Sequence, residues 1–206
     1  MSEDSTAKLY TLPILRLTKV SDIPGENFLA VDHQQAGQHV KYWRERERDK
    51  VAHWRTFRKF PLVLNADGSL WEPACLWLLD RAEAKPLHVS SLAFVAQGLK
   101  DYKRFLDDLS LTWDDFSQVD KYNRPTYLYK TYLQDLLSSG QIKGSTAKRR
   151  MSTVVGFYRF LRDHSRMRFE PLNEPWVESR LGVGYKDSRG FRPFHYTQLH
   201  LSSASP

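Results

Sequence analysis

Apolar residues recur every three or four positions in the second half of the chain, which is the spacing of one face of an α-helix. The longest such stretch runs from Ser145 to His164. Its apolar stripe consists of Ala147, Met151, Val154, Val155, Tyr158 and Leu161. Gly144 precedes it, and Ser145 can accept a backbone N–H bond in the first turn, so we expect Ser145 to cap this helix.

Two further helices are predicted upstream by the same criterion. One begins after Ser90 or Ser91 and carries a stripe of apolar residues: Leu92, Val95, Ala96, Leu99, Tyr102, Leu106 and Leu109. The other begins at Pro125, whose fixed φ suits the first helical position, and ends at Ser138-Ser139-Gly140. Pro175 and Trp176 are expected to start a short closing helix.

The first half of the chain is less regular. Residues 9–20 hold short apolar runs broken by Pro13, typical of an edge strand or an ordered arm. Residues 34–59 predict a helix that is apolar only at its two ends, with charges of alternating sign from Arg44 to Lys50. Residues 61–71 predict a β-hairpin, because Asp67-Gly68 supplies turn residues and glycine accepts positive φ.

These elements predict a mainly α fold: four or five helices, preceded by a small β-hairpin and a helical N-terminal extension. We expect the extension with its charged helix over residues 1–59, and the hairpin with a linker over residues 60–86. The helical domain should cover residues 87–181. Residues 182–206, rich in Gly, Ser and Pro, are interpreted as a second linker.

Positive charge is concentrated in one segment. The chain of 206 residues has a formal net charge of +7. Between Lys143 and Arg168, Lys and Arg are opposed by a single acidic residue, Asp163, and this segment alone also carries +7. The remainder is therefore balanced. Concentrated positive charge is what a polyanion-binding surface needs.

The rest of the composition bears on the cellular compartment and on the kinds of site the chain can contain. Cys75 is the only cysteine, which excludes an internal disulfide and a cysteine-based zinc site and favours a reducing compartment. No apolar run approaches the roughly 20 residues that cross a bilayer, and the N-terminus lacks the pattern of a secretory signal. We expect a cytoplasmic protein.

The charged segment coincides with the predicted helix that begins at Ser145. At about 100° per residue, Gly156 falls with several polar residues on the side opposite the apolar stripe. Basic residues on such a side are often merely solvated, but the local excess of charge favours contact with a phosphate backbone or a major groove. The candidate DNA contacts on this side are Lys148, Arg149, Ser152 and Arg159. Further candidates are Lys143, Ser145 and Thr146 at the helix start, Arg150 nearer the apolar side, and Gln97 and Lys100 from the helix that begins near Ser91.

A family resemblance appears at this helix. The run Ser145-Thr146-Ala147-Lys148-Arg149-Arg150-Met151-Ser152, followed by Phe157-Tyr158-Arg159-Phe160-Leu161, resembles the last long helix of the core-binding domain of tyrosine recombinases of the phage-integrase type. The resemblance covers residues 60–176, including Leu172-Asn173-Glu174-Pro175-Trp176. It implies a SAM-like helical domain that grips one face of a duplex recombination half-site, and association with other recombinase protomers on DNA.

The same resemblance locates the catalytic residues elsewhere. Recombinases of this family cleave DNA with a tyrosine nucleophile assisted by Arg, Lys and His or Trp residues of a separate domain that follows the linker. This chain contains no His-x-x-Arg pair, so we expect no catalytic residue in it. It would be the N-terminal portion of a recombinase or a truncated relative. We expect no metal, because His33 and His39 lack partners at ligand spacing, and no cofactor, because Gly182-Val-Gly184 is too sparse for a phosphate loop.

Two other functions remain open. The chain could be a free-standing DNA-binding regulator that uses the same helices. It could instead be a helical protein-interaction module whose basic side meets an acidic partner and whose alternating-charge segment, Arg44 to Lys50, mediates assembly. The predicted helix over residues 34–59 is equally consistent with an arm that contacts DNA or a neighbouring subunit and with a surface helix held by its two Trp side chains.

Overall fold

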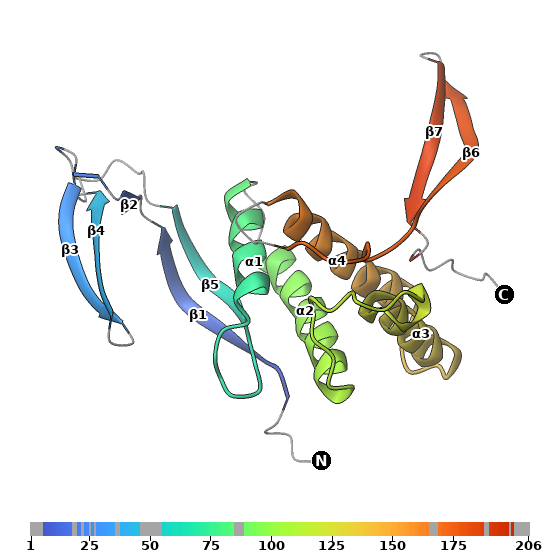
Figure 1. Cartoon of the computed structure of the whole chain (residues 1–206), viewed down its shortest axis with the longest axis horizontal. Coiled ribbons are helices and arrows are strands. Elements are labelled where there is room, and N and C mark those ends of the chain that lie inside the picture. Colours follow the sequence, from blue (N-terminus) through green and yellow to red (C-terminus); the bar gives the residue numbers. More distant parts are fainter. Residues whose placement is uncertain are drawn as a thin grey trace. The chain divides into compact units, whose positions relative to one another are not determined.

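The structure is a computed structural model that describes residues 6–17, 20–21, 23–24, 26, 28–35, 38–45, 55–84, 89–164, 169–187, 190–197 and 199. Within these residues four α-helices combine with seven strands (Figure 1). The helices are α1 (Glu72–Ala84), α2 (Val89–Asp108), α3 (Pro125–Ser138) and α4 (Gly144–Asp163), with a short 3₁₀ helix, η2 (Lys121–Asn123), before α3. The strands are β1 (Lys8–Leu17), β2 (Val20–Ser21), β3 (Phe28–Gln35), β4 (Gln38–Glu45), β5 (Arg55–Leu64), β6 (Glu178–Asp187) and β7 (Gly190–Thr197).

These strands make the fold mixed α/β, so the prediction of a mainly α fold is wrong. In the described residues they form three small sheets, with the strand orders β1-β5, β2-β4-β3 and β6-β7. The chain divides into two compact units. One contains residues 1–10 and 61–206, and therefore all four helices; the other contains residues 11–60.

The unit of residues 11–60 contains no helical extension in its described part. Strand β4 lies between β2 and β3, paired antiparallel with both, from Phe28 opposite Glu45 to Gln35 opposite Gln38. The predicted helix over residues 34–59 is thus wrong for Gln38–Glu45 and for the residues in β5, while residues 46–54 lie outside the described part. A segment as short as Gln38–Glu45 fits the period of a helix as well as that of a strand. Its pairing with neighbouring strands, and its Val, Tyr and Trp side chains, which favour strands, make it a strand. The strand alternative for residues 9–20 is confirmed by β1.

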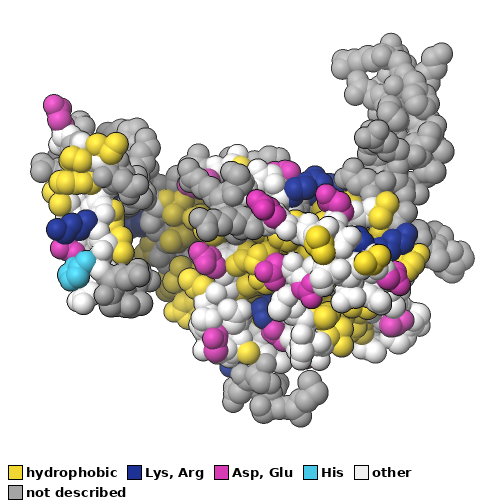
Figure 2. Space-filling view, in the orientation of Figure 1, with side chains coloured by type: hydrophobic (Ala, Val, Ile, Leu, Met, Phe, Trp, Pro, Cys, Tyr) yellow, Lys and Arg dark blue, Asp and Glu magenta, His cyan; other side chains and the backbone are white. Residues whose placement is uncertain are grey.

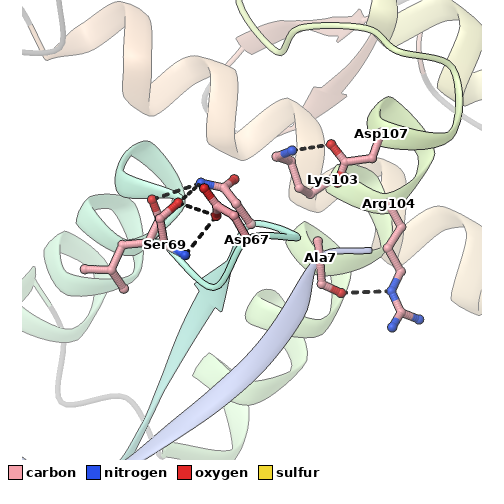
Figure 3. Close-up of polar contacts among 8 residues, drawn as sticks. Ala7, Asp67, Ser69, Lys103, Arg104 and Asp107 are labelled. Carbon is pink, nitrogen blue, oxygen red and sulfur yellow. Dashed lines mark hydrogen bonds and ion pairs between the residues drawn. The ribbon is translucent and has the colours of Figure 1, made fainter. Parts of the chain in front are cut away.

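The predicted hairpin near residue 65 is present in a reduced form. Strand β5 ends at Leu64, and the chain returns with a single bridge between Leu64 and Leu70 before α1 begins. Gly68 has φ +85°, which confirms the predicted positive φ. Asp67 accepts hydrogen bonds from the backbone N–H and the hydroxyl of Ser69, at 2.9 and 2.6 Å, and closes the turn (Figure 3).

The three predicted helices are confirmed as α2, α3 and α4, with starts and ends close to those expected. Helix α4 buries its whole apolar stripe, whereas the stripe of α2 is buried except for half-buried Val95 and for Leu109, which is 52% exposed. In α3, Tyr129 and Leu133 are buried and Tyr132 is 39% exposed. One other expectation fails here. Residues 81–84 belong to α1 rather than to a linker, because the apolar run before them continues as a helix.

The core of the helical unit is aromatic and centres on α4. The ring of Phe157 lies 5.3 Å from that of Trp71 and 6.0 Å from that of Trp77, measured between centroids. Next to it the hydroxyl of Tyr158 lies 2.7 Å from that of Tyr102 and donates to the carbonyl of Trp113 at 2.6 Å. Both tyrosines are 0% exposed. Helix α4 is therefore held to α1, to α2 and to the loop that follows α2.

The first described residues are also part of the helical unit. Arg104 of α2 donates through Nε to the carbonyl of Ala7 at 3.0 Å, and Ala7 is fully buried (Figure 3). The preceding residue, Lys103, forms an ion pair with Asp107, one turn further along α2. The chain immediately before β1 is thus fixed on α2 by a contact between residues far apart in sequence.

The segment after α4 differs from expectation. Residues 172–177 form bends rather than a closing helix, and the expected linker over residues 182–206 contains β6 and β7, which pair antiparallel from Glu178 opposite Thr197 to Asp187 opposite Gly190. The glycines of this segment resemble a linker, but the intervening aromatic residues favour strands. None of the helices in the described part of the chain is both long and apolar enough to span a membrane.

Candidate nucleic-acid interface

Helix α4 separates a buried side from an exposed one, as its pattern predicts. Every residue of the predicted apolar stripe is at most 9% exposed. On the other side Arg149, Ser152 and Arg159 are exposed and Lys148 is half-buried. Gly156 departs from the expectation, because a Cβ atom there would lie 3.0 Å from Cζ2 of Trp77. It therefore packs closely against Trp77 of α1 and is only partly exposed.

The start of α4 differs by one residue from the prediction. The helix begins at Gly144, and Lys143 occupies the N-cap position with extended φ and ψ of −80° and 152°. Ser145 is therefore inside the first turn and does not cap the helix. Lys143 itself makes no side-chain cap bond. An N-terminus of this kind favours an anion through its backbone N–H groups and helix dipole.

Asp101 of α2 engages several of the predicted contacts. Its Oδ2 lies 2.8 Å from Nη2 of Arg150, in an ion pair without the alignment of a good hydrogen bond. Its Oδ1 accepts from the amide of Gln97 at 2.9 Å and lies 3.8 Å from Nζ of Lys100. Partial burial lowers the pKa of Lys100, and Asp101 opposes that effect. Arg150, Gln97 and Lys100 are thus engaged within the protein, which makes them weaker candidates for DNA contact than the exposed residues of α4.

Arg149 and Phe94 lie beside this cluster. The guanidinium carbon of Arg149 is 5.0 Å from the ring centroid of Phe94, a residue of α2 that is 56% exposed. Together with Thr146 and Gln97 they line a small depression of about 50 Å³ between α2 and α4. An exposed phenylalanine next to an arginine offers an apolar contact and a forked donor at neighbouring positions, which are the groups that read thymine methyls and guanine edges.

A second arginine cluster lies near the end of α4. The guanidinium carbons of Arg159 and Arg162 are 5.9 and 6.0 Å from the ring centroid of Trp176. Trp176 is 4% exposed, whereas both arginines are exposed. A carboxylate oxygen of Asp163 lies 3.5 Å from Nε of Arg162. Trp176 follows α4 by more than ten residues and is brought back beneath it.

The structure thus brings the predicted residues into two groups and adds residues that the sequence did not single out. Gln97, Lys100, Thr146, Arg149 and Arg150 gather where α2 meets α4. Lys143 and Ser145 are at the start of α4, and Lys148, Ser152 and Arg159 lie along it. The added residues are Phe94, Asp101, Arg162 and Trp176. Helical spacing could have identified two of these four residues. Asp101 is four residues after Gln97 and Arg162 is three after Arg159, and residues with these spacings are neighbours on a helix surface.

The surface itself carries its positive charge in patches. On the face in view in Figure 2, Lys and Arg side chains over the described helices form small separate groups, with Asp and Glu between them. This distribution agrees with Asp101 beside Arg150 and Asp163 beside Arg162. Contact with a polyanion would therefore be made at discrete points along α4.

Comparison with known proteins leaves the family open: no protein-family model, no curated protein and no solved structure matches the chain. The function therefore has to be argued from the site, because a fold of this general kind supports many functions.

Proposed function

We propose that the chain binds duplex DNA through the exposed side of α4, as the core-binding portion of a site-specific tyrosine recombinase. The observation that carries the proposal is the division of α4 into a fully packed side and an exposed side that bears Arg149, Ser152 and Arg159. A helix that is fixed by its core contacts can enter a groove without reorganising. The resemblance of this same helix to that of phage-type integrases supports the choice of DNA over other polyanions.

The proposed contacts fall into two kinds. Lys143, Lys148 and Arg159 would neutralise phosphates, which supplies affinity but no sequence information. Arg149 and Ser152 would face base edges, where an arginine fork pairs with the two acceptors of guanine. Arg150, Lys100 and Gln97 would hold the interface in shape through Asp101. The proposed role is binding, and no catalytic step is assigned to this chain.

The setting follows from the same proposal. The partner would be a recombination half-site, and protomers would associate on paired sites, as the resemblance to recombinases implies. The compartment would be the cytoplasm.

The test is fluorescence anisotropy of the 206-residue chain on duplexes across a salt series. One duplex comes from the ends of the element that encodes the chain, and the other is a scrambled sequence. We expect tighter binding to the element ends. The variant Lys148→Ala/Arg149→Ala should weaken binding and reduce the slope of log K against log salt by about 0.9 per lost phosphate contact.

The matched control removes two charges from the other unit, with Arg16→Ala/Arg58→Ala, both of which are exposed. It should leave the slope unchanged. Equal affinity for both duplexes would leave a basic module without sequence preference. Absence of binding at low salt, or equal binding to heparin and duplex, would contradict the proposal and favour the protein-interaction module.

A further inference from the structure

Two exposed arginines share one buried tryptophan at the end of α4. Arg159 and Arg162 are one turn apart on the helix, and each places its guanidinium about 6 Å from the centre of the Trp176 ring. The ring is 4% exposed, so the arginine side chains cover a core residue. These two residues are called the arginine pair below.

The backbone around Trp176 is fastened to the start of α3. Arg124 donates through Nη1 to the carbonyl of Glu174 at 2.8 Å, and the hydroxyl of Thr126 donates to the carbonyl of Pro175. On the other side of the tryptophan, the N–H of Val177 donates to the hydroxyl of Tyr127 at 3.1 Å. Arg124 and Tyr127 are themselves buried. The ring beneath the arginine pair is therefore held in place from both sides.

This arrangement places two cations beside one ring, and the ring itself takes none of their hydrogen-bond donors; one donor, Nε of Arg162, is directed at Oδ1 of Asp163 at 3.5 Å. A guanidinium beside a ring is attracted through its positive charge, whereas its N–H groups lie in its own plane and can still donate to another group. Arg150 differs, because its Nη2 faces the carboxylate of Asp101 at 2.8 Å. Arginines that are already ordered lose less side-chain entropy when a phosphate binds. The planar fork matches two phosphate oxygens.

We infer that Arg159 and Arg162, ordered by Trp176, form a phosphate-binding pair that holds the DNA backbone across the major groove from Lys148 and the start of α4. The inference rests on the proposed DNA-binding function and deepens it. Lys148 and Arg159 are eleven residues apart, which is about 16 Å along a helix at 1.5 Å per residue. The major groove is about 12 Å wide, so its two phosphate walls lie within this span, and the flexible Lys and Arg side chains can take up the difference. Trp176 acts as a positioning residue.

The acidic residue next to the pair competes with this ligand. The Asp163 carboxylate is 3.5 Å from Nε of Arg162, and its side chain is 65% exposed. An ion pair this exposed is weak. A phosphodiester that accepts from both arginines would displace it.

The experiment measures duplex binding by anisotropy across a salt series for the full chain. For Arg159→Ala/Arg162→Ala we expect the salt slope to fall by about 1.8, that is about 0.9 per phosphate, and the dissociation constant to rise at least tenfold. Arg159→Lys/Arg162→Lys keeps both charges, so the slope should be kept while the dissociation constant rises several-fold, because the planar fork and its contact with the Trp176 ring are lost.

A coupling measurement tests Trp176 itself. Trp176→Phe keeps an aromatic ring, and should raise the dissociation constant several-fold in the wild-type background without changing the slope. In the Arg159→Ala/Arg162→Ala background it should have no further effect. A purely structural role for Trp176 would weaken binding equally in both backgrounds, which would overturn the positioning role.

The control Arg16→Ala/Arg58→Ala removes the same net charge from residues 11–60. A wild-type chain that binds duplex DNA, with an unchanged slope in Arg159→Ala/Arg162→Ala, overturns the arginine pair and leaves the proposed function standing. An equal fall of the slope in the control also overturns it, because the effect would then report net charge alone. A wild-type chain that does not bind duplex DNA overturns both.

Discussion

The hydroxyl of Tyr158 is the middle of a buried chain of two hydrogen bonds, and this makes a sharp stability prediction possible. A carbonyl can only accept, so Tyr158 donates its single proton to Trp113 O at 2.6 Å and must accept from Tyr102 at 2.7 Å. The direction of both bonds is thus defined. The two tyrosines are 0% exposed, and water cannot replace either partner around their hydroxyls.

Because the two hydrogen bonds have defined directions, Tyr158→Phe and Tyr102→Phe should lower the free energy of unfolding by different amounts. Tyr158→Phe removes both bonds and leaves the Tyr102 hydroxyl and the Trp113 carbonyl without partners. At about 1–3 kcal/mol for each buried group left unsatisfied, and less for a half-buried carbonyl, the free energy of unfolding should fall by about 2–4 kcal/mol. Tyr102→Phe removes one donor and keeps the bond to Trp113, so it should cost about 1 kcal/mol. The double variant removes the orphaned hydroxyl and should be no less stable than Tyr158→Phe.

The assay is urea unfolding, followed by circular dichroism and tryptophan fluorescence, for the wild type and the three variants as a double-mutant cycle. Tyr132→Phe is the control, since Tyr132 is 39% exposed, and it should change stability by less than about 0.5 kcal/mol. Equal losses for Tyr102→Phe and Tyr158→Phe that add in the double variant would refute the directed chain.

Three further predictions concern other groups. Burial raises the pKa of three tyrosines above the ordinary value of about 10, so their folded forms bind the proton more tightly and stability should fall as pH rises past 10, by up to about 1.4 kcal/mol per pH unit for each group. The tyrosines are Tyr102, Tyr129 and Tyr158. In a pH titration, the rise of tyrosinate absorbance should therefore coincide with the loss of helical circular dichroism. Ionisation of these groups while the protein remains folded would contradict the prediction. Arg124→Lys should lower the free energy of unfolding in urea by about 2–4 kcal/mol, because one ammonium cannot reach the three carbonyls that the guanidinium bonds; a loss below about 0.5 kcal/mol would be inconsistent with that role. Asp163→Asn should strengthen duplex binding a few-fold in the anisotropy assay, since it removes a carboxylate beside Arg162; weaker binding would count against the arginine pair.

The helices from α2 to α4 were predictable because their signals are local. The stripes that begin at Leu92 and Ala147, the proline at position 125 and the glycine at position 140 all act within one or two turns. In the folded protein these helices pack mainly through the apolar side that the sequence pattern identifies. The start of α4 was displaced by one residue, since helix ends depend on caps that neighbouring residues can exchange.

The strands were harder to predict because their partners are not local. Val40 and Trp43 are three residues apart, which fits a helix, and only the pairing of β4 with β2 and β3 assigns them to a sheet. The glycines at positions 182 and 184 are typical of a linker, yet the strand they belong to pairs with β7. In both cases the deciding interaction is a partner strand, which a single window of sequence does not contain.

In the candidate site, too, local features could be predicted from the sequence and contacts between distant segments could not. The exposed side of α4 was predicted from the period of the helix, whereas the groups that modify it come from elsewhere in the chain. Asp101 reaches Arg150 across the α2–α4 contact, and Trp176 reaches Arg159 from beyond the end of α4. Periodicity identifies which arginines face outward. It does not tell which of them form an ion pair with a carboxylate and which lie beside an aromatic ring.

The hydrogen bond from Arg104 to Ala7 has a consequence for the order of folding. During synthesis at about 5–20 residues per second, Ala7 leaves the ribosome roughly 5–20 seconds before its partner, since 97 residues separate them. Residues 11–60, which form a compact unit of their own, emerge in that interval. The start of β1 therefore cannot dock on α2 until late in synthesis, after the strands of the other unit have already emerged.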